Sequence, residues 1–278
     1  MTDLRPTASL ASSRAAGRSF VQSSAFEVLS RAGFVARGLV YGIIGILALK
    51  LAFGHGGKLT NQQGALKTVA HQPFGTVLLT LVAIGLGGYS IWRFVRAAIG
   101  HGPEGSDTGF ERVAALASGT AYGALCFLAI EILVSGHGST SGSPKQATAG
   151  IFGWPGGTWI VGIAGVVMIG VALYQGYRGV TRKFLEDSKV EEMEPEVKKW
   201  ISRLGMVGHL ARMVVFGLVG IFLVKAAIDY NPRKAVGLDG ALAKVTHYSY
   251  GPFLLGIVAA GLIAFAVYSL SDARYRRI

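Results

Sequence analysis

Charged residues are scarce in this sequence, at 15% of 278 positions, whereas a soluble domain carries about 25%. Cysteine occurs once, as Cys126, so no disulfide can form within the chain. Walker glycine loops, nucleophile elbows and His-Glu-x-x-His pairs are missing, so we expect neither an enzyme nor a bound cofactor. Hydrophobic residues make up 51% of the chain. This composition is typical of a protein that lies in the lipid bilayer.

The hydrophobic residues are concentrated in long runs. A bilayer core of about 30 Å needs roughly 20 mainly apolar residues in a helix. Six runs meet this length, so we predict an all-α protein with six transmembrane helices, near Phe34 to Phe53, Phe74 to Val95, Val113 to Ser135, Thr158 to Tyr177, Met206 to Ile228 and Pro252 to Leu270.

Lysine and arginine are distributed unevenly over the segments that flank these runs. Eighteen of them lie on the side that carries both chain ends, and six lie on the other side. Because basic residues concentrate on the cytoplasmic side of membrane proteins, we predict that both termini are cytoplasmic. Orientation also explains the net charge of +12, so we expect no binding to nucleic acid.

The sequence contains an internal repeat. The first and fifth predicted helices match at a shift of 175 residues, and the second and sixth match at 176. The middle pair matches the first pair at shifts of 81 and 85, with Ser118 in place of Arg37 and no clear counterpart of the turn at residues 72–75. Each pair begins on the same side, so we predict three parallel two-helix repeats around a pseudo-threefold axis along the membrane normal.

The pattern Gly-x-x-Ala-Arg-Gly-x-x-Tyr-Gly-x-x-Gly at residues 33–45 carries a family resemblance. Together with Gly64-Ala65-Leu66, Gln72-Pro73-Phe74-Gly75 and Tyr89 to Arg93, it resembles the bacterial membrane family named domain of unknown function 1206. The resemblance implies a triplicated two-helix layout in the bacterial cytoplasmic (inner) membrane. It implies no particular activity.

We divide the chain into five parts on this basis. They are a cytoplasmic N-terminal tail (1–29), repeat 1 (30–100), repeat 2 (108–182), a cytoplasmic connector (183–202) and repeat 3 (203–272).

Small residues recur at helical spacing in three of the predicted helices. Glycine lets helix backbones approach closely in lipid, where no hydrophobic effect drives helices together. We therefore predict helix-packing roles for Gly38, Gly42, Gly45, Gly119, Gly123, Gly217 and Gly220.

Charged residues near the spans are the usual indicators of function in membrane proteins. Lys50, Glu131 and Lys225 are equivalent by repeat and are predicted to meet in a polar cluster near the outer helix ends. Alternatively, the lysines simply extend to the interface. Arg37 and Arg212 lie thirteen residues earlier, about 140° around the helix, so we interpret them as membrane anchors.

Histidines gather on the predicted outer side. His55 and His137 share a Gly-His-Gly context, and His71 matches His247. Their spacing does not fit a helical metal pair, so they are weak candidates for a metal or haem site.

Three hypotheses for function follow. Abundant packing glycine favours a non-enzymatic interaction or accessory module, with the bilayer, a membrane protein or a second copy of the chain as partner. The first alternative is a small solute or ion transporter or channel that uses Lys50, Glu131 and Lys225. The second alternative is a haem- or metal-binding membrane protein.

Overall fold

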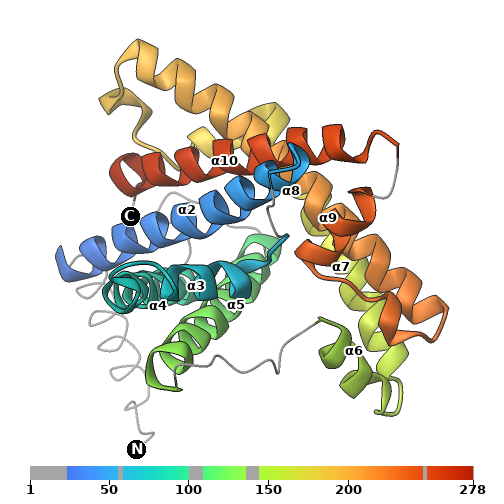
Figure 1. Ribbon diagram of the computed structural model, residues 1–278. Coiled ribbons are helices and arrows are strands. Elements are labelled where there is room, and N and C mark those ends of the chain that lie inside the picture. The colour runs from blue at the N-terminus through green and yellow to red at the C-terminus, as the bar shows by residue number, and fades with distance from the viewer. Residues whose placement is uncertain (1–23, 56–58, 100–108, 136–143, 247–248, 278) are drawn as a thin grey trace, which may run out of the picture.

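The protein is a multi-pass helical membrane protein. The computed structural model describes residues 24–55, 59–99, 109–135, 144–246 and 249–277 (Figure 1). Within these ranges, six helices are long and apolar enough to cross a membrane. They are α2 (Ser24–Ala52), α4 (Gly75–Ile99), α5 (Gly109–Ser135), α7 (Gly157–Thr181), α8 (Pro195–Ile228) and α10 (Gly251–Tyr275). The prediction of six spans is confirmed.

A short helix precedes the second long helix of each repeat. These helices are α3 (Gln62–Ala70), α6 (Pro144–Phe152) and α9 (Leu238–Thr246). Sequence comparison found no clear counterpart of the turn at residues 72–75 in the middle repeat, because the turn after α6, residues 154–157, shares only its proline and its last glycine with it. Each repeat is therefore a long–short–long unit, and the middle repeat does have its counterpart of that turn.

The sharp corner between each short helix and the long helix after it requires glycine. A Cβ atom added at Gly75, Gly157 or Gly251 would collide with a backbone carbonyl oxygen at the end of the preceding short helix. The same position is thus a glycine in all three repeats, because any side chain would prevent the close approach.

The six long helices are arranged in a pseudo-threefold ring. The second helix of each repeat packs against the first helix of the next, which pairs α4 with α5, α7 with α8 and α10 with α2. Within repeats, α2 packs on α4 and α8 packs on α10. In Figure 1, α2 and α10 lie side by side although they are at opposite ends of the chain. The predicted pseudo-threefold arrangement is confirmed.

The ring is open in the middle repeat, where α5 and α7 do not pack as the other pairs do. In repeats 1 and 3, an added Cβ at Gly33 would lie 2.5 Å from the Tyr89 Cβ, and one at Gly208 would lie 2.6 Å from the Phe265 Cα. The equivalent residue of α5 is Ala114, which already carries a Cβ atom. The middle repeat therefore cannot close in the same way.

The predicted packing glycines lie where neighbouring repeats meet. An added Cβ on the α2 glycines would contact α10, one on the α5 glycines would contact α4, and one on the α8 glycines would contact α7. The set comprises Gly38, Gly42, Gly45, Gly119, Gly123, Gly217 and Gly220.

Two predicted boundaries differ from the structure. Residues 24–29, inside the predicted tail 1–29, already belong to helix α2, and Phe26 is buried against Phe34, Tyr89 and Trp92. Helix α8 begins at Pro195, inside the predicted connector 183–202. Proline suits the first turn of a helix, where its missing N–H would have no partner. The connector is therefore shorter than predicted and contains the 3-10 turns η1 (Lys183–Leu185) and η2 (Val190–Glu192).

We predict that Gly85→Ala destabilises the protein and that the repeat-equivalent Gly170→Ala does not. An added Cβ at Gly85 would lie 2.7 Å from the carbonyl oxygen of Ala32, whereas nothing lies within 4 Å of one at Gly170. Overpacking of this kind costs about 1–3 kcal/mol. Thermal unfolding of both variants in detergent measures the difference, and equal melting temperatures would refute the proposed opening of the middle repeat.

Candidate functional site: a basic central cavity

A cavity of about 770 Å³ lies within the helix ring, and all six long helices contribute to its wall. Three sets of repeat-equivalent positions face it. One set holds the two arginines and a serine, and the other two hold aromatic residues. The sets are Arg37, Ser118 and Arg212; Tyr41, Tyr122 and Phe216; and Tyr89, Tyr174 and Phe265. The pseudo-threefold axis therefore passes through the cavity.

The wall of the cavity is strongly basic. Seven basic and three acidic side chains line it, which leaves a surplus of four positive charges. The basic residues are Arg37, Arg93, Arg96, Arg178, Lys183, Arg212 and Arg276, and the acidic residues are Glu186, Asp187 and Asp272. Ionisable groups at membrane depth are costly and usually mark a functional site.

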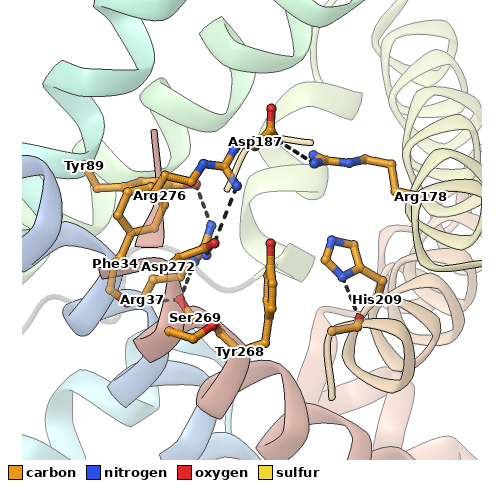
Figure 2. A network of polar contacts seen from close by, with 12 residues as sticks. Phe34, Arg37, Tyr89, Arg178, Asp187, His209, Tyr268, Ser269, Asp272 and Arg276 are labelled. Carbon is orange, nitrogen blue, oxygen red and sulfur yellow. Dashed lines mark hydrogen bonds and ion pairs between the residues drawn. The ribbon is translucent and has the colours of Figure 1, made fainter. Parts of the chain in front are cut away.

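Arg37 is buried and fully paired. Its Nε donates to Ser269 Oγ at 2.7 Å, one Nη donates to the Tyr89 hydroxyl at 2.9 Å, and the other donates to Asp272 Oδ2 at 2.8 Å. Figure 2 shows these groups converging from α2, α4 and α10. The interpretation of Arg37 as a membrane anchor is wrong, because its guanidinium points to the axis of the bundle and not to a lipid headgroup.

Asp187, in the connector, joins arginines from all three repeats. It accepts from Arg178 at 2.6 Å and from Arg276 at 2.7 Å (Figure 2). It also lies 3.4 Å from Arg96. The backbone N–H of Arg277 also donates to the Asp187 carbonyl oxygen, at 3.0 Å. These contacts fix the connector across the end of the cavity that lies on the side of the chain termini.

Arg276 lies between two carboxylates at this end of the cavity. Burial alone would lower the pKa of its guanidinium, but Asp187 and Asp272 outweigh burial and raise the pKa above its ordinary value. Arg276 therefore stays charged, and the contact between connector and bundle remains an ion pair.

Arg212 has no carboxylate partner among the described residues. Its guanidinium carbon lies 4.4 Å from the ring centre of Phe265 and 4.9 Å from that of Phe216. When the side-chain amide of Gln175 is oriented so that its oxygen and its nitrogen both face suitable partners, the oxygen accepts hydrogen bonds from the two Nη groups of Arg212 at 3.0 and 2.9 Å. The buried Nε has no hydrogen-bond partner. Arg212 is thus a cavity residue, and its interpretation as a membrane anchor is also wrong.

Arg93 is the second cavity arginine without a carboxylate partner in the described part of the chain. Its Nε and Nη2 donate to the Tyr89 hydroxyl at 3.0 and 2.8 Å. Arg93 and Arg212 therefore carry positive charge that no carboxylate among the described residues compensates.

The predicted cluster of Lys50, Glu131 and Lys225 does not form the cavity. None of the three lines it, and Lys50 and Lys225 are exposed. The reason is the helical geometry that separates positions thirteen residues apart by about 140°. Because the Arg37 position faces the axis, the Lys50 position faces away from it.

The structure describes two of the four candidate histidines. His55 and His71 are exposed, while His137 and His247 lie outside the described residues. No group of three potential metal ligands occurs in the part of the chain that the structure describes.

Sequence reasoning missed the acidic partners of the site, Asp187 and Asp272. Asp272 lies at the end of the sixth span and Asp187 in a connector rich in charge, so neither resembles an intramembrane charge by position alone. The repeat equivalence of Arg37 and Arg212 could have indicated the site, because symmetry places equivalent residues around the same axis.

The comparison with protein families matches the same model three times, at residues 32–100, 113–182 and 207–276. The model is described as Domain of Unknown Function (DUF1206). The chain belongs to this family. Each DUF1206 match contains one long–short–long unit, apart from the first part of its first helix.

A relative of similar length comes from Bacillus subtilis (strain 168). It is described as uncharacterized protein YxxB and is 31% identical over 252 residues, which cover 89% of this chain and 90% of that protein. No solved structure matches the chain.

We predict that Asp272→Asn strongly destabilises the protein, because the buried Arg37 would lose its counter-charge. Breaking a buried ion pair costs about 3–5 kcal/mol. Glu191→Gln is the control, because the Glu191–Arg277 pair has side-chain exposures of 65% and 56% and such pairs contribute about 0–1 kcal/mol. Thermal unfolding in detergent compares them, and an equal effect of both variants would contradict the assigned role of Asp272.

Proposed function

We propose that this DUF1206 protein binds a small anionic solute in its central cavity, as a non-enzymatic binding or transport protein of the membrane. The observation that carries the proposal is the surplus of four positive charges on the cavity wall, with Arg93 and Arg212 lacking carboxylate partners among the described residues.

The chemistry of these side chains favours an anion. Guanidinium groups present planar arrays of N–H donors that match carboxylate and phosphate oxygens. A buried charge without a counter-charge costs free energy, and a bound anion would recover that cost. The cavity volume also lies within the range of about 300–1,000 Å³ found for small-molecule sites.

The position of the glycines supports this proposal over an accessory module. The accessory hypothesis rests on the abundance of packing glycine. The predicted packing glycines lie at the contacts between repeats, and the centre holds a basic cavity. We retain the transport hypothesis, with Arg93 and Arg212 in place of the predicted cluster of Lys50, Glu131 and Lys225.

The orientation of the chain completes the proposal. We propose that the side of the chain termini faces the cytoplasm and that the protein resides in the bacterial inner membrane. The bias of eighteen basic residues to six supports this orientation. The arginine-rich end of the cavity, near Asp187, would then lie toward the cytoplasm.

We predict that inorganic phosphate or glycerol 3-phosphate raises the melting temperature of the purified protein and that Arg212→Gln removes this effect. A ligand that binds only the folded state stabilises it by about 2.7 kcal/mol at 100 times its dissociation constant. Titration of each anion, followed by thermal unfolding at constant ionic strength, measures the shift.

The matched control is Lys225→Gln, which removes one positive charge from the same helix at an exposed position outside the cavity wall. It should keep the wild-type shift. The proposal fails if no anion stabilises the wild type, or if the two variants respond alike.

A further inference from the structure

The opening between α5 and α7 turns one wall of the cavity toward lipid. On α5, Ala114, Ala117, Ala121 and Ala124 line the cavity at spacings of three and four residues, which places them on one helix face. On α7, Val167 also lines the cavity and is nevertheless 59% exposed. Because α5 and α7 do not pack against each other as the other pairs do, the cavity is open between them, within segments that span the membrane.

The α7 wall of this opening changes from polar to apolar along the membrane normal. On α7, Arg178, Gln175 and Tyr174 line the cavity near the side of the termini, and Val171, Met168, Val167 and Ala164 follow deeper in the span. At 1.5 Å per residue the wall from Arg178 to Ala164 is about 21 Å long. One leaflet of the hydrocarbon core is about 15 Å deep. The wall can therefore hold a hydrocarbon chain below a charged head.

The charged end of this wall is suited to an anionic head. Arg93 and Arg178 occupy equivalent positions of repeats 1 and 2, and Arg212 lies on the same cavity from repeat 3. The third equivalent of Arg37 and Arg212 is Ser118, whose small side chain leaves room beside the opening where a third guanidinium would stand. An oxyanion placed there would meet Arg212 without displacing a carboxylate.

We propose that the occupant of the cavity is a lipid with an anionic, phosphate-type head, which enters sideways between α5 and α7. This inference rests on the proposed function and names its substrate class. The head binds Arg212 and Arg93, and the hydrocarbon chain lies between the alanine face of α5 and the valine-containing face of α7. A lipid suits the opening better than a water-soluble anion does, because the rim is apolar and the connector crosses the nearby end through Asp187.

The test compares a lipid with its water-soluble head. The full chain, purified in a neutral detergent, is titrated with dioleoyl phosphatidic acid, dioleoyl phosphatidylcholine or glycerol 3-phosphate, and the melting temperature is recorded. We expect phosphatidic acid to stabilise the wild type at concentrations at least tenfold below those needed of the other two. Arg212→Gln should weaken phosphatidic acid binding about tenfold or more, because it removes a charged hydrogen-bond donor.

Ala121→Trp isolates the lateral route. Ala121 lines the opening, so a tryptophan there should abolish stabilisation by phosphatidic acid while leaving that by glycerol 3-phosphate. Ile130→Trp is the matched control, because Ile130 is 48% exposed on the same helix and does not line the cavity. It should behave as the wild type does.

The outcomes separate the two proposals. If glycerol 3-phosphate binds through Arg212 and phosphatidic acid binds no better, or if Ala121→Trp leaves the lipid effect intact, the lipid inference is wrong and the anion-binding function stands. If neither compound stabilises the wild type, both proposals fall. A destabilised Ala121→Trp protein is still informative, because its response to glycerol 3-phosphate reports whether the cavity has formed.

Discussion

Charge at membrane depth is costly unless it is paired, since lipid offers neither water nor counter-ions. In this molecule four arginines of the cavity are paired with carboxylates near the axis of the helix ring, whereas Arg93 and Arg212 are not among the described ion pairs. Arg37 binds Asp272, and Arg276 joins Asp272 to Asp187, which also holds Arg178 and Arg96. Helices from all three repeats, together with the connector, contribute side chains to this network (Figure 2). The network therefore sets both the arrangement of the repeats and the polarity of the space between them.

The symmetry of the ring is broken at one place, and the break creates the cavity's access. Glycine at Gly33 and Gly208 allows the first and third repeats to close, whereas Ala114 keeps the middle repeat apart. The same repeat replaces the axial arginine with Ser118. The middle repeat thus supplies a lateral opening and the space behind it, while repeats 1 and 3 supply the arginines at the Ser118-equivalent position, Arg37 and Arg212.

The distribution of charge distinguishes the roles of the arginines. Arg37 is held by three protein groups and is structural. Arg212 is held by aromatic faces and an amide, and these contacts leave its positive charge without compensation. A positive charge of that kind stabilises the fold little by itself and gains most from a bound anion. Arg37 in repeat 1 and Arg212 in repeat 3 thus occupy equivalent positions, and we assign a structural role to the first and anion binding to the second.

The amino-acid sequence by itself determined the six spans, the three parallel repeats and the glycines at their contacts, because hydrophobic length, repeat spacing and small-residue spacing are local properties of the chain. Tertiary structure alone decided which face of each helix meets the axis. Helical geometry already separated Arg37 from Lys50 by about 140°, but only the packed ring shows that the arginine faces inward. The partners Asp187 and Asp272 come from distant parts of the chain, and their contacts depend on the folded arrangement of all three repeats.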